Sequence, residues 1–523
     1  MLSNLVAILK LSKYKITKKE KMTKIKSATP IIFLTILFGL IFFYRLDYNT
    51  LASWDEAWYG SIAREMARSG DFIRMMWNGK PYFDHPPMGF WLMAISYKLF
   101  GINEFSTRFP STLLGLLSIL LIYKTAIELY GKKVIGVAAA LIMGTSVWYV
   151  IRVRSGNLDS IFILFNILTV FLSVKSANNF KFFPLVMLAL AGLVLTKTLV
   201  GVSAVILIIW LNFGQLLKLK KNFLYLLLGL LLFFSAIAPW YDFHLKTYSG
   251  FWQHHIFNIG TRNKSLETYL HPMVEKPLFY LHMGVRKWYY IWIASLGFIF
   301  ITFKFIKKNI FFLILWNFVI LYPFLTAKET ELWHLIPVYL PLSFIVAVGM
   351  YEGALLANHI LIRIISRHSG KRSGTGRYPR VHPDLNNDSG VAVPLLPGMT
   401  HFLYLLFFLY ISFIQIKIFY PEVFPANKWI PDDVAISQAA AKYDKPIFLD
   451  DDYLPIAVFY SGQSVQPLAY LSDDKKTLEK FMQSDMKNFV VITRNWVVDD
   501  LESKNIAYKL LEKNNSFSIL TNP

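Results

Sequence analysis

Long apolar runs alternate along the chain with short polar segments that are rich in lysine and arginine. Several of these runs approach the roughly 20 residues that a helix needs to cross a bilayer. Basic clusters recur at every second break, for example at 130–133, 218–221 and 304–309. Such alternation is typical of the cytoplasmic loops of a multi-pass protein. We therefore predict a polytopic α-helical membrane protein with about 11 spans, the first beginning near residue 30.

The same alternation assigns sides to the remaining segments. Residues 1–29 carry many lysines and are expected to be a cytoplasmic N-terminus that is followed by an uncleaved signal anchor. Residues 366–398 are rich in Gly, Ser, Pro and Arg, which predicts a flexible cytoplasmic loop inside the 30–426 membrane domain. An odd number of spans then places residues 427–523 outside the cytoplasm.

The C-terminal tail differs in pattern from the membrane domain. KPIFLD (445–450) and FVVITR (489–494) have the length and composition of short buried strands, and residues 473–483 have helical spacing. Strands that alternate with a helix indicate a small extracytoplasmic α/β domain over 427–523. Its sequence contains no glycine motif of the nucleotide-binding type.

Composition narrows the class further. Of the 523 residues 55% are hydrophobic and only 17% are charged, which is too apolar for an ordinary soluble protein. The formal charge of +21 lies mostly in the loops between apolar runs, so topology explains it and no nucleic-acid partner is required. The chain has no cysteine, which excludes disulfides and thiolate metal sites.

Two longer polar segments on the predicted outer side, 48–108 and 241–276, are the candidate catalytic loops. The first contains SWDEAWYG at 53–60 and NGKPYFDHPPMGFW at 78–91. Each motif places ionisable side chains among aromatic rings close to an apolar run. Aromatic rings are enriched at membrane interfaces, so both motifs are expected to lie at the outer membrane surface.

The acidic pair in the first motif has two interpretations. Ser53 and Glu56 have the spacing of a capping box, and Gly70 stands where the following helix would end. Asp55 and Glu56 would then lie in the first turn and offset the helix dipole. The alternative is functional, because a helix start keeps a carboxylate ionised, as a general base must be. The second motif adds His85, which follows Asp84 in a loop stiffened by prolines on both sides.

Cations on the outer side contradict the charge rule and need another explanation. RVRSGNLDS supplies Arg152, Arg154 and the acid Asp159, LTKTLVG supplies Lys197, and the second outer loop supplies Arg262. Lysine and arginine are normally depleted on this side. They either extend towards lipid headgroups or bind an anion at the membrane face, such as a lipid phosphate.

These motifs together resemble one known family. The acidic pair, the Pro-Pro loop, RVRSGNLDS, GLVLTKTLVG (192–201) and ELWHLIPVYLPL (331–342) are similar to those of the bacterial GT-C glycosyltransferases. The similar branches are the lipid A aminoarabinose transferases and the relatives of the dolichyl-phosphate-mannose protein mannosyltransferases. The resemblance covers roughly residues 30–345 in order. His85 stands where the aminoarabinose branch usually has lysine.

The resemblance implies a hexosyl- or pentosyltransferase that takes a sugar from a polyprenyl-phosphate carrier and delivers it to a lipid, glycan or protein on the outer face of the cytoplasmic membrane. Displacing such a carrier requires a base for the acceptor hydroxyl and cations around the leaving phosphate. A divalent metal is compatible with this chemistry but is not required by the sequence. We expect an inverting transfer with Asp55 as base, supported by Glu56 and Asp159, and with His85, Arg154, Lys197 and Arg262 as phosphate ligands.

A transporter or flippase of lipid-linked sugars is the alternative from another class. Transporters usually place ionisable groups near the bilayer midplane, often in repeated halves. In this sequence the acids and cations lie at the ends of outer loops, and no internal repeat is evident. The distribution of charge therefore favours the transferase.

The topology is directly testable because the chain contains no cysteine. Single cysteines at Ser369 and Ser472 should lie on opposite sides of the membrane. An impermeant maleimide applied to intact cells should label the Ser472→Cys protein and leave the Ser369→Cys protein unlabelled until the cells are opened. Equal labelling of both variants in intact cells would contradict the assignment.

Overall fold

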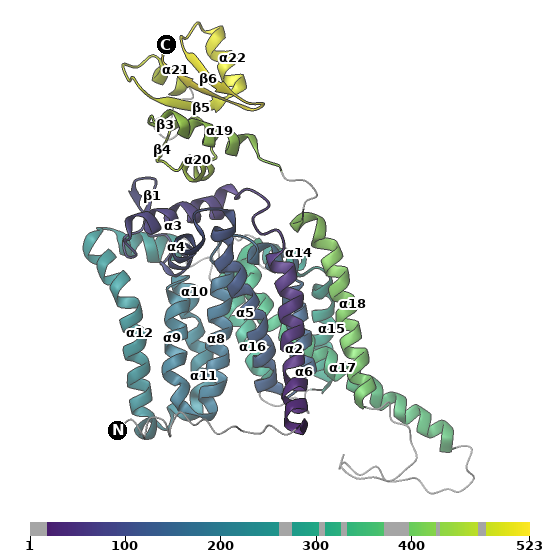
Figure 1. Cartoon of the computed structure of the whole chain (residues 1–523). Helices are drawn as coiled ribbons and strands as arrows, with labels where there is room; N and C mark the ends of the chain where they lie inside the picture. Colours follow the sequence, from purple (N-terminus) through teal and green to yellow (C-terminus); the bar gives the residue numbers. More distant parts are fainter. Residues whose placement is uncertain are drawn as a thin grey trace.

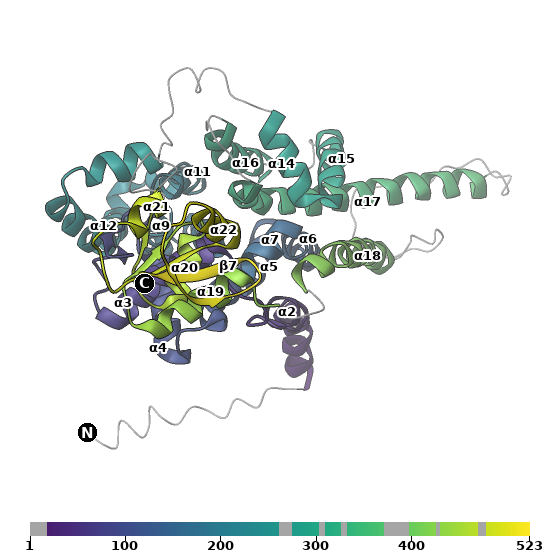
Figure 2. The same cartoon turned by 90° about the horizontal axis from the view of Figure 1, so that it is seen from above.

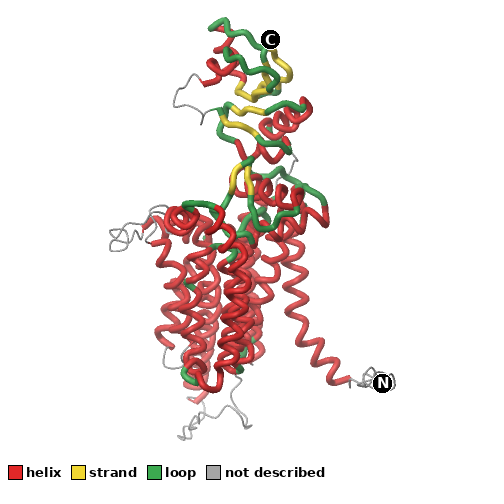
Figure 3. Tube along the Cα trace, turned by 90° about the vertical axis from the view of Figure 1, so that its left-hand side faces the viewer, coloured by secondary structure: helices red, strands yellow, loops and turns green. Residues whose placement is uncertain are grey.

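The computed structural model describes residues 18–260, 275–302, 309–325, 332–370, 397–424, 429–468 and 477–523. Long helices run side by side and carry a smaller mixed α/β tail at one end (Figures 1 and 3). The helices of the body are α2 (Lys18–Phe43), α5 (Glu104–Tyr130), α6 (Lys133–Gly144), α7 (Val147–Val153), α8 (Asp159–Asn178), α9 (Phe183–Val194), α10 (Thr198–Val202), α11 (Ala204–Leu216), α12 (Leu219–Thr247), α14 (Glu275–Val285), α15 (Lys287–Thr302), α16 (Asn309–Leu325), α17 (Tyr339–Gly370) and α18 (Pro397–Val423).

The predicted membrane spans coincide with these helices. Within the described ranges, six helical segments are long and apolar enough to cross a membrane, and α6 and α7 make a seventh if they are taken as one bent span. The described ranges also contain five shorter apolar helices, of which those in α2, α9, α15 and α16 lie in the remaining predicted spans and the fifth, 88–100, lies in the first outer loop. The helical membrane fold is therefore confirmed, and the number of 11 spans stays a prediction. The six long segments are 104–130, 159–178, 198–216, 220–247, 333–361 and 398–421.

A sharp bend separates α6 from α7 and directs the end of α7 towards the tail side of the body. The two helices meet at 73°. Hydroxyl groups at the break donate hydrogen bonds to carbonyls of the preceding turn. Thr145 donates to Leu141 O at 2.7 Å, and Ser146 donates to Ile142 O at 2.8 Å. Such bonding makes a broken helix tolerable in an apolar surrounding. The bend places Arg152, near the end of α7, beside the first outer loop.

The first outer loop folds into a small layer on top of the helices (Figure 1). As predicted, its helix ends at Gly70, whose φ of 74° is in the left-handed region. Residues 59–64 and Met66 of this helix are buried. The elements of this layer are η1 (Ser53–Ala57), α3 (Trp58–Ser69), β1 (Met76–Trp77), β2 (Lys80–Pro81) and α4 (Met88–Phe100).

The start of that helix corrects one sequence prediction. The α-helix begins at Trp58, so Asp55 and Glu56 lie in the wide turn η1 before it and not in its first helical turn. The predicted capping box is also wrong in register, because the N-cap of the turn is Ala52 and the Glu56 carboxylate accepts the Ala52 N–H at 2.9 Å. The physical reason is that Glu56 is drawn inwards to a buried arginine, which a simple helix start would not allow.

The tail forms a five-stranded sheet in the order β4-β3-β5-β7-β6. β3 pairs in parallel with β4 and β5, and β7 pairs antiparallel with β5 and β6. Both predicted strands and part of the predicted helix are present, since β3, β5 and α21 lie within the expected ranges. The elements are α19 (Asp432–Ala440), β3 (Ile447–Leu449), α20 (Leu454–Ser461), β4 (Val465–Pro467), α21 (Thr477–Met482), β5 (Val490–Arg494), α22 (Asn495–Ser503), β6 (Lys509–Lys513) and β7 (Phe517–Thr521).

The tail and the first outer loop share one hydrophobic core. Ile62 and Met66 of α3 belong to the same buried cluster as Ile456 and Val458 of α20 and Ile492 of β5. Seen from above, the tail covers the early helices and leaves α15, α17 and α18 to one side (Figure 2). The tail therefore lies on the same side of the body as the first outer loop. Whether that side is extracytoplasmic stays a prediction, as does the domain boundary at 427, and the predicted 366–398 loop lies mostly outside the described residues.

Candidate functional site

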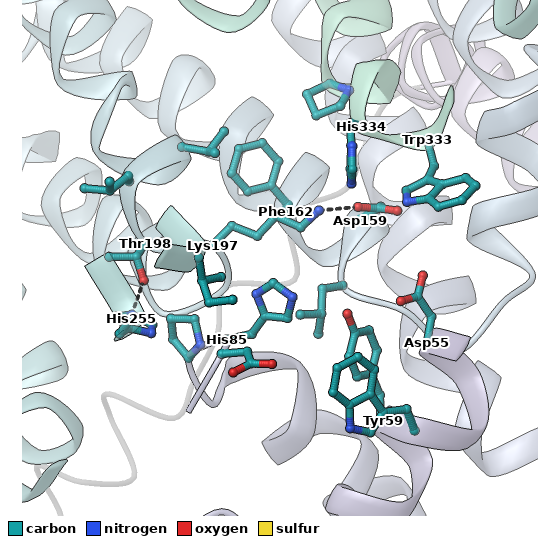
Figure 4. Close-up of a pocket in the computed structure, with 18 of the residues that line it drawn as sticks. Asp55, Tyr59, His85, Asp159, Phe162, Lys197, Thr198, His255, Trp333 and His334 are labelled. Carbon is teal, nitrogen blue, oxygen red and sulfur yellow. Dashed lines mark hydrogen bonds and ion pairs between the residues drawn. The ribbon is translucent and has the colours of Figure 1, made fainter. Parts of the chain in front are cut away.

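A cavity of about 560 Å³ lies where the first outer loop meets the ends of the helices. In Figure 4, Asp55, Tyr59 and His85 from the first loop face Lys197 and Asp159 across this cavity. A third wall comes from Trp333 and His334 in η4 (Leu332–Val338). The remaining lining residues are Trp58, Asp84, Pro86, Arg152, Leu158, Phe162, Thr198, Leu199, Val200, His255, Asn258, Ile259 and Pro337.

Two acids and two cations form a continuous chain along the cavity. Arg152 donates from Nη2 to Asp55 Oδ2 and from Nε to Asp159 Oδ2, both at 2.6 Å. Lys197 donates from Nζ to the other oxygen of Asp159 at 2.5 Å. The Asp159 side chain is almost fully buried, whereas those of Asp55 and Lys197 are 22% and 23% exposed. Asp159 therefore holds both cations in place, and Asp55 and Lys197 remain accessible.

Local backbone geometry brings these groups together. Asp159 begins α8, and its N–H donates to Asn157 Oδ1 at 2.8 Å. The Asn157 amide donates in turn to Arg152 O at 2.6 Å, which ties the end of α7 to the start of α8. Lys197 occupies the N-cap position of the short helix α10 and reaches Asp159 from the neighbouring turn. The three residues thus converge although they come from three separate helix ends.

Asp55 sits on strained backbone. Its φ of 66° and ψ of −73° are close to the values of the classic γ-turn, a rare conformation for a residue other than glycine. Residues held in such regions cost of the order of 1–3 kcal/mol and concentrate at functional sites. The conformation directs the carboxylate to Arg152, and Tyr59 lines the cavity beside it. The strain at Asp55 is therefore an observation that favours a functional role.

Glu56 locks this turn from inside the protein. Its carboxylate accepts from Arg108 Nε at 2.8 Å and Nη2 at 3.0 Å, and from the Gly156 N–H at 2.7 Å. Burial alone would raise the pKa of Glu56, but the Arg108 charge and these hydrogen bonds outweigh it and lower the pKa below 4.5. Arg108 also donates to Leu46 O and Asn49 O. Glu56 is thus an ionised structural group that does not line the cavity.

Two adjacent histidines fasten the second outer loop to the first. His254 lies 2.6 Å from Asp84 Oδ1 through Nε2, and His255 donates from Nδ1 to Phe83 O at 2.7 Å. In a neutral ring the other nitrogen, Nε2, must then accept a hydrogen bond, and the Thr198 hydroxyl donates to it at 2.6 Å. Burial lowers the pKa of His255 to about 4, which keeps the ring neutral. Both histidines thus join η3 (Gln253–Gly260) to the Pro-Pro loop through hydrogen bonds.

Four of the seven predicted site residues line the cavity. The structure brings Asp55, Asp159, His85 and Lys197 together at the cavity. Glu56 and Arg154 do not line it: Arg154 donates to Ile41 O and Phe42 O, and its guanidinium lies over the Phe424 ring. Arg262 lies outside the described residues.

The sequence analysis counted Arg152 among the outward cations but not among the phosphate ligands, whereas the structure lines the cavity with Arg152 and not with Arg154. The available signal in the sequence was that Arg152 and the acid Asp159 are seven residues apart in the same short segment, which allows an ion pair between them. Asp84 and His255 also line the cavity but were not among the predicted site residues, because their hydrogen-bond partners lie 57 to 172 residues away in the sequence. The described residues include no group of three or more histidine or acidic side chains placed to hold a metal ion, so the metal prediction is untested.

Sequence comparison finds a matching family over part of the chain. Residues 84–241 match the dolichyl-phosphate-mannose-protein mannosyltransferase family model. An uncharacterised protein of Aquifex aeolicus is 31% identical over 160 residues, which is 30% of this chain and 32% of the relative. The undecaprenyl phosphate-alpha-4-amino-4-deoxy-L-arabinose arabinosyl transferase of Aeromonas hydrophila is 40% identical over 111 residues, which is 21% of this chain and 19% of the relative. The chain therefore matches a third or less of these relatives' length.

Comparison with solved structures extends the similarity in fold to nearly the whole chain. ArnT from Cupriavidus metallidurans, in its undecaprenyl phosphate complex, has a TM-score of 0.64 at 14% identity and covers 95% of this chain and 98% of ArnT. Its apo form has a TM-score of 0.65 at 15% identity. At this identity the likeness concerns the fold alone. Together the matches confirm the resemblance to the GT-C glycosyltransferases, and to the aminoarabinose transferases in particular.

The depressed pKa of His255 predicts a pH-dependent stability. Because the folded pKa of about 4 is below the ordinary 6.5, the unfolded chain binds a proton first as the pH falls. The contribution of His255 is complete above pH 6.5 and is lost as the pH falls from 6.5 towards 4. His255→Gln should flatten this part of a plot of thermal midpoint against pH, and His401→Gln in α18 controls for loss of a ring elsewhere. An unchanged slope in His255→Gln would contradict the buried neutral ring.

Proposed function

We propose that this protein is a membrane glycosyltransferase that moves a sugar from a polyprenyl-phosphate carrier to an acceptor hydroxyl. The observation that carries the proposal is the cavity itself, where the accessible carboxylate of Asp55 is linked to Arg152 and Lys197 through a continuous chain of ion pairs. Relatives matching part of the chain are named as transferases acting with undecaprenyl phosphate, and a protein of the same fold has been solved with undecaprenyl phosphate bound. A base beside phosphate-binding cations is the set of groups this chemistry needs.

In the proposed reaction Asp55 removes the proton of the acceptor hydroxyl, and the oxygen attacks C1 of the donor sugar. The bond from C1 to the phosphate oxygen breaks, and polyprenyl phosphate leaves with the electron pair. Attack from the face opposite the phosphate inverts the configuration at C1. The negative charge that develops on the leaving oxygen is the part of the reaction that fixed cations stabilise best.

Lys197, Arg152 and His85 are the proposed phosphate ligands. Lys197 and Arg152 are oriented by a buried carboxylate, that of Asp159, so little reorganisation is needed when an anion arrives. Arg152 has a second consequence for catalysis. The Arg152 guanidinium occupies one carboxylate oxygen of Asp55, and a phosphate that takes over Arg152 would free that oxygen to accept the proton of the acceptor hydroxyl. Donor binding and activation of the base are thereby coupled.

In this proposal Glu56 positions the turn that carries Asp55. The acceptor is a lipid, a glycan or a protein. The active site and the tail are proposed to face the outside of the cytoplasmic membrane. Both lie at the end of the helical body opposite the start of α2, and the N-terminus before α2 is predicted to be cytoplasmic (Figure 1).

Incubation of the purified protein with a polyprenyl-phosphate sugar tests the proposed function, because the carrier should be released as polyprenyl phosphate. Mass spectrometry of envelope lipids and glycans with and without the protein identifies the acceptor.

Asp55→Asn tests the base. The amide is nearly isosteric, so the variant should fold and bind donor, while turnover should fall by about 10²–10⁴ because the proton acceptor is lost. Asp47→Asn is the matched control, since Asp47 is an exposed carboxylate in the turn just before this loop and does not line the cavity. A folded Asp55→Asn protein with the turnover of Asp47→Asn would show that Asp55 is not the base.

Arg152 and Arg154 form a matched pair for testing phosphate binding. They are two residues apart, but only Arg152 lines the cavity. Arg152→Lys should weaken the binding of undecaprenyl phosphate about tenfold or more, because lysine cannot keep the two-sided contact of a guanidinium. Arg154→Lys should leave that affinity unchanged and lower thermal stability through lost carbonyl contacts. Equal affinities in the two variants would remove Arg152 from the phosphate site.

A further inference from the structure

The C-terminal tail packs directly against the turn that carries Asp55. Helix α20 contacts both η1 and α3, and Leu454, Ile456, Val458 and Phe459 along it are buried. In Figure 1 this helix is the lowest part of the tail, immediately above the first outer loop. The tail is therefore a structural neighbour of the cavity, although none of its described residues lines it.

One hydroxyl of α20 bonds to the chain just before that turn. The Tyr460 oxygen accepts the Leu51 N–H at 2.7 Å and donates to Glu104 Oε1 at 2.9 Å. The next backbone N–H, that of Ala52, is taken by Glu56. Two consecutive N–H groups at the entrance of the turn are thus held by two different parts of the protein, one by the tail and one by the Glu56–Arg108 pair.

Further polar contacts fix α20 relative to the first loop. The buried Arg64 side chain of α3 donates to Val458 O at 3.1 Å and Phe459 O at 2.7 Å, at the carboxyl end of α20. Asn78, at the tip of the β1–β2 hairpin, exchanges two bonds with the backbone of Val465, at 2.6 and 2.8 Å. Because these contacts fix the tail relative to the first outer loop, the Tyr460 hydroxyl lies at a defined position beside the Leu51 N–H.

We propose that Tyr460 is a positioning residue of the catalytic centre and that the tail is a working part of the enzyme. This inference rests on the proposed function, with Asp55 as the base. A strained φ of 66° at Asp55 persists only if the surrounding structure holds it. Tyr460 supplies that restraint from the tail side of the turn, and Glu56 supplies it from the body. Loss of the Tyr460 bond allows the turn to relax and moves the carboxylate of Asp55 away from the acceptor hydroxyl.

Tyr460→Phe removes the hydroxyl and keeps the ring. Turnover should fall about tenfold, as expected for one hydrogen bond that orients a catalytic group, with the KM for donor within about twofold of wild type. Tyr508→Phe is the matched control, since the Tyr508 hydroxyl donates to Glu502 on an exposed surface of the same tail. On the partner side, Glu104→Gln keeps an acceptor oxygen and should stay near wild type, whereas Glu104→Ala should resemble Tyr460→Phe.

Hydrogen–deuterium exchange supplies a readout that does not depend on activity. Exchange in the peptide covering residues 48–57 should rise in Tyr460→Phe and remain at the wild-type rate in Tyr508→Phe. Turnover and exchange equal in the two variants would overturn the positioning role. Wild-type protein without transferase activity would instead overturn the proposed function, and the exchange of residues 48–57 would still decide whether Tyr460 holds the turn.

Discussion

The buried pair of Glu56 and Arg108 joins the segments on which the cavity depends. Glu56 accepts hydrogen bonds from the N–H groups of Ala52 and Gly156, while Arg108 donates to three carbonyls of the segment that follows α2, those of Leu46, Asn49 and Thr50. A buried ion pair is tolerated when hydrogen bonds satisfy its remaining atoms, and loss of one partner typically costs about 3–5 kcal/mol. Here the pair sets the backbone of the turn, and the turn sets the direction of Asp55.

The cavity combines rigid and accessible groups in a way that suits transfer from an anionic carrier. Asp159 is almost fully buried and pairs with both cations, so it acts as the fixed support for Arg152 and Lys197. Asp55 and Lys197 stay partly accessible at either end of this chain. The formal charges of the four residues sum to zero, which avoids an uncompensated charge at a site near the membrane, where such a charge would be expensive.

Loops distant in sequence surround the cavity, and their contacts explain how a membrane bundle builds a precise site. The first loop is held by the second loop through His254 and His255, by the helix ends through Arg108, and by the tail through Tyr460. Each contact links the loop to a different part of the chain. A site built on loops needs such support from surrounding residues to hold its side chains in a defined geometry.

The sequence by itself determined the helical membrane class, both predicted tail strands and four of the residues at the cavity. Apolar length, local spacing and outward cations are properties of short stretches, so they can be recognised without a fold. It placed Glu56 beside Asp55 in the catalytic group and chose Arg154 as a phosphate ligand, whereas Asp55 and Arg152 are the members of these two pairs that line the cavity. Those choices depend on partners 52 to 113 residues away, such as Arg108 for Glu56 and Ile41 for Arg154. Neighbouring residues with the same chemistry point in opposite directions because one backbone angle and one distant partner decide their orientation, and only the tertiary structure brings those partners together.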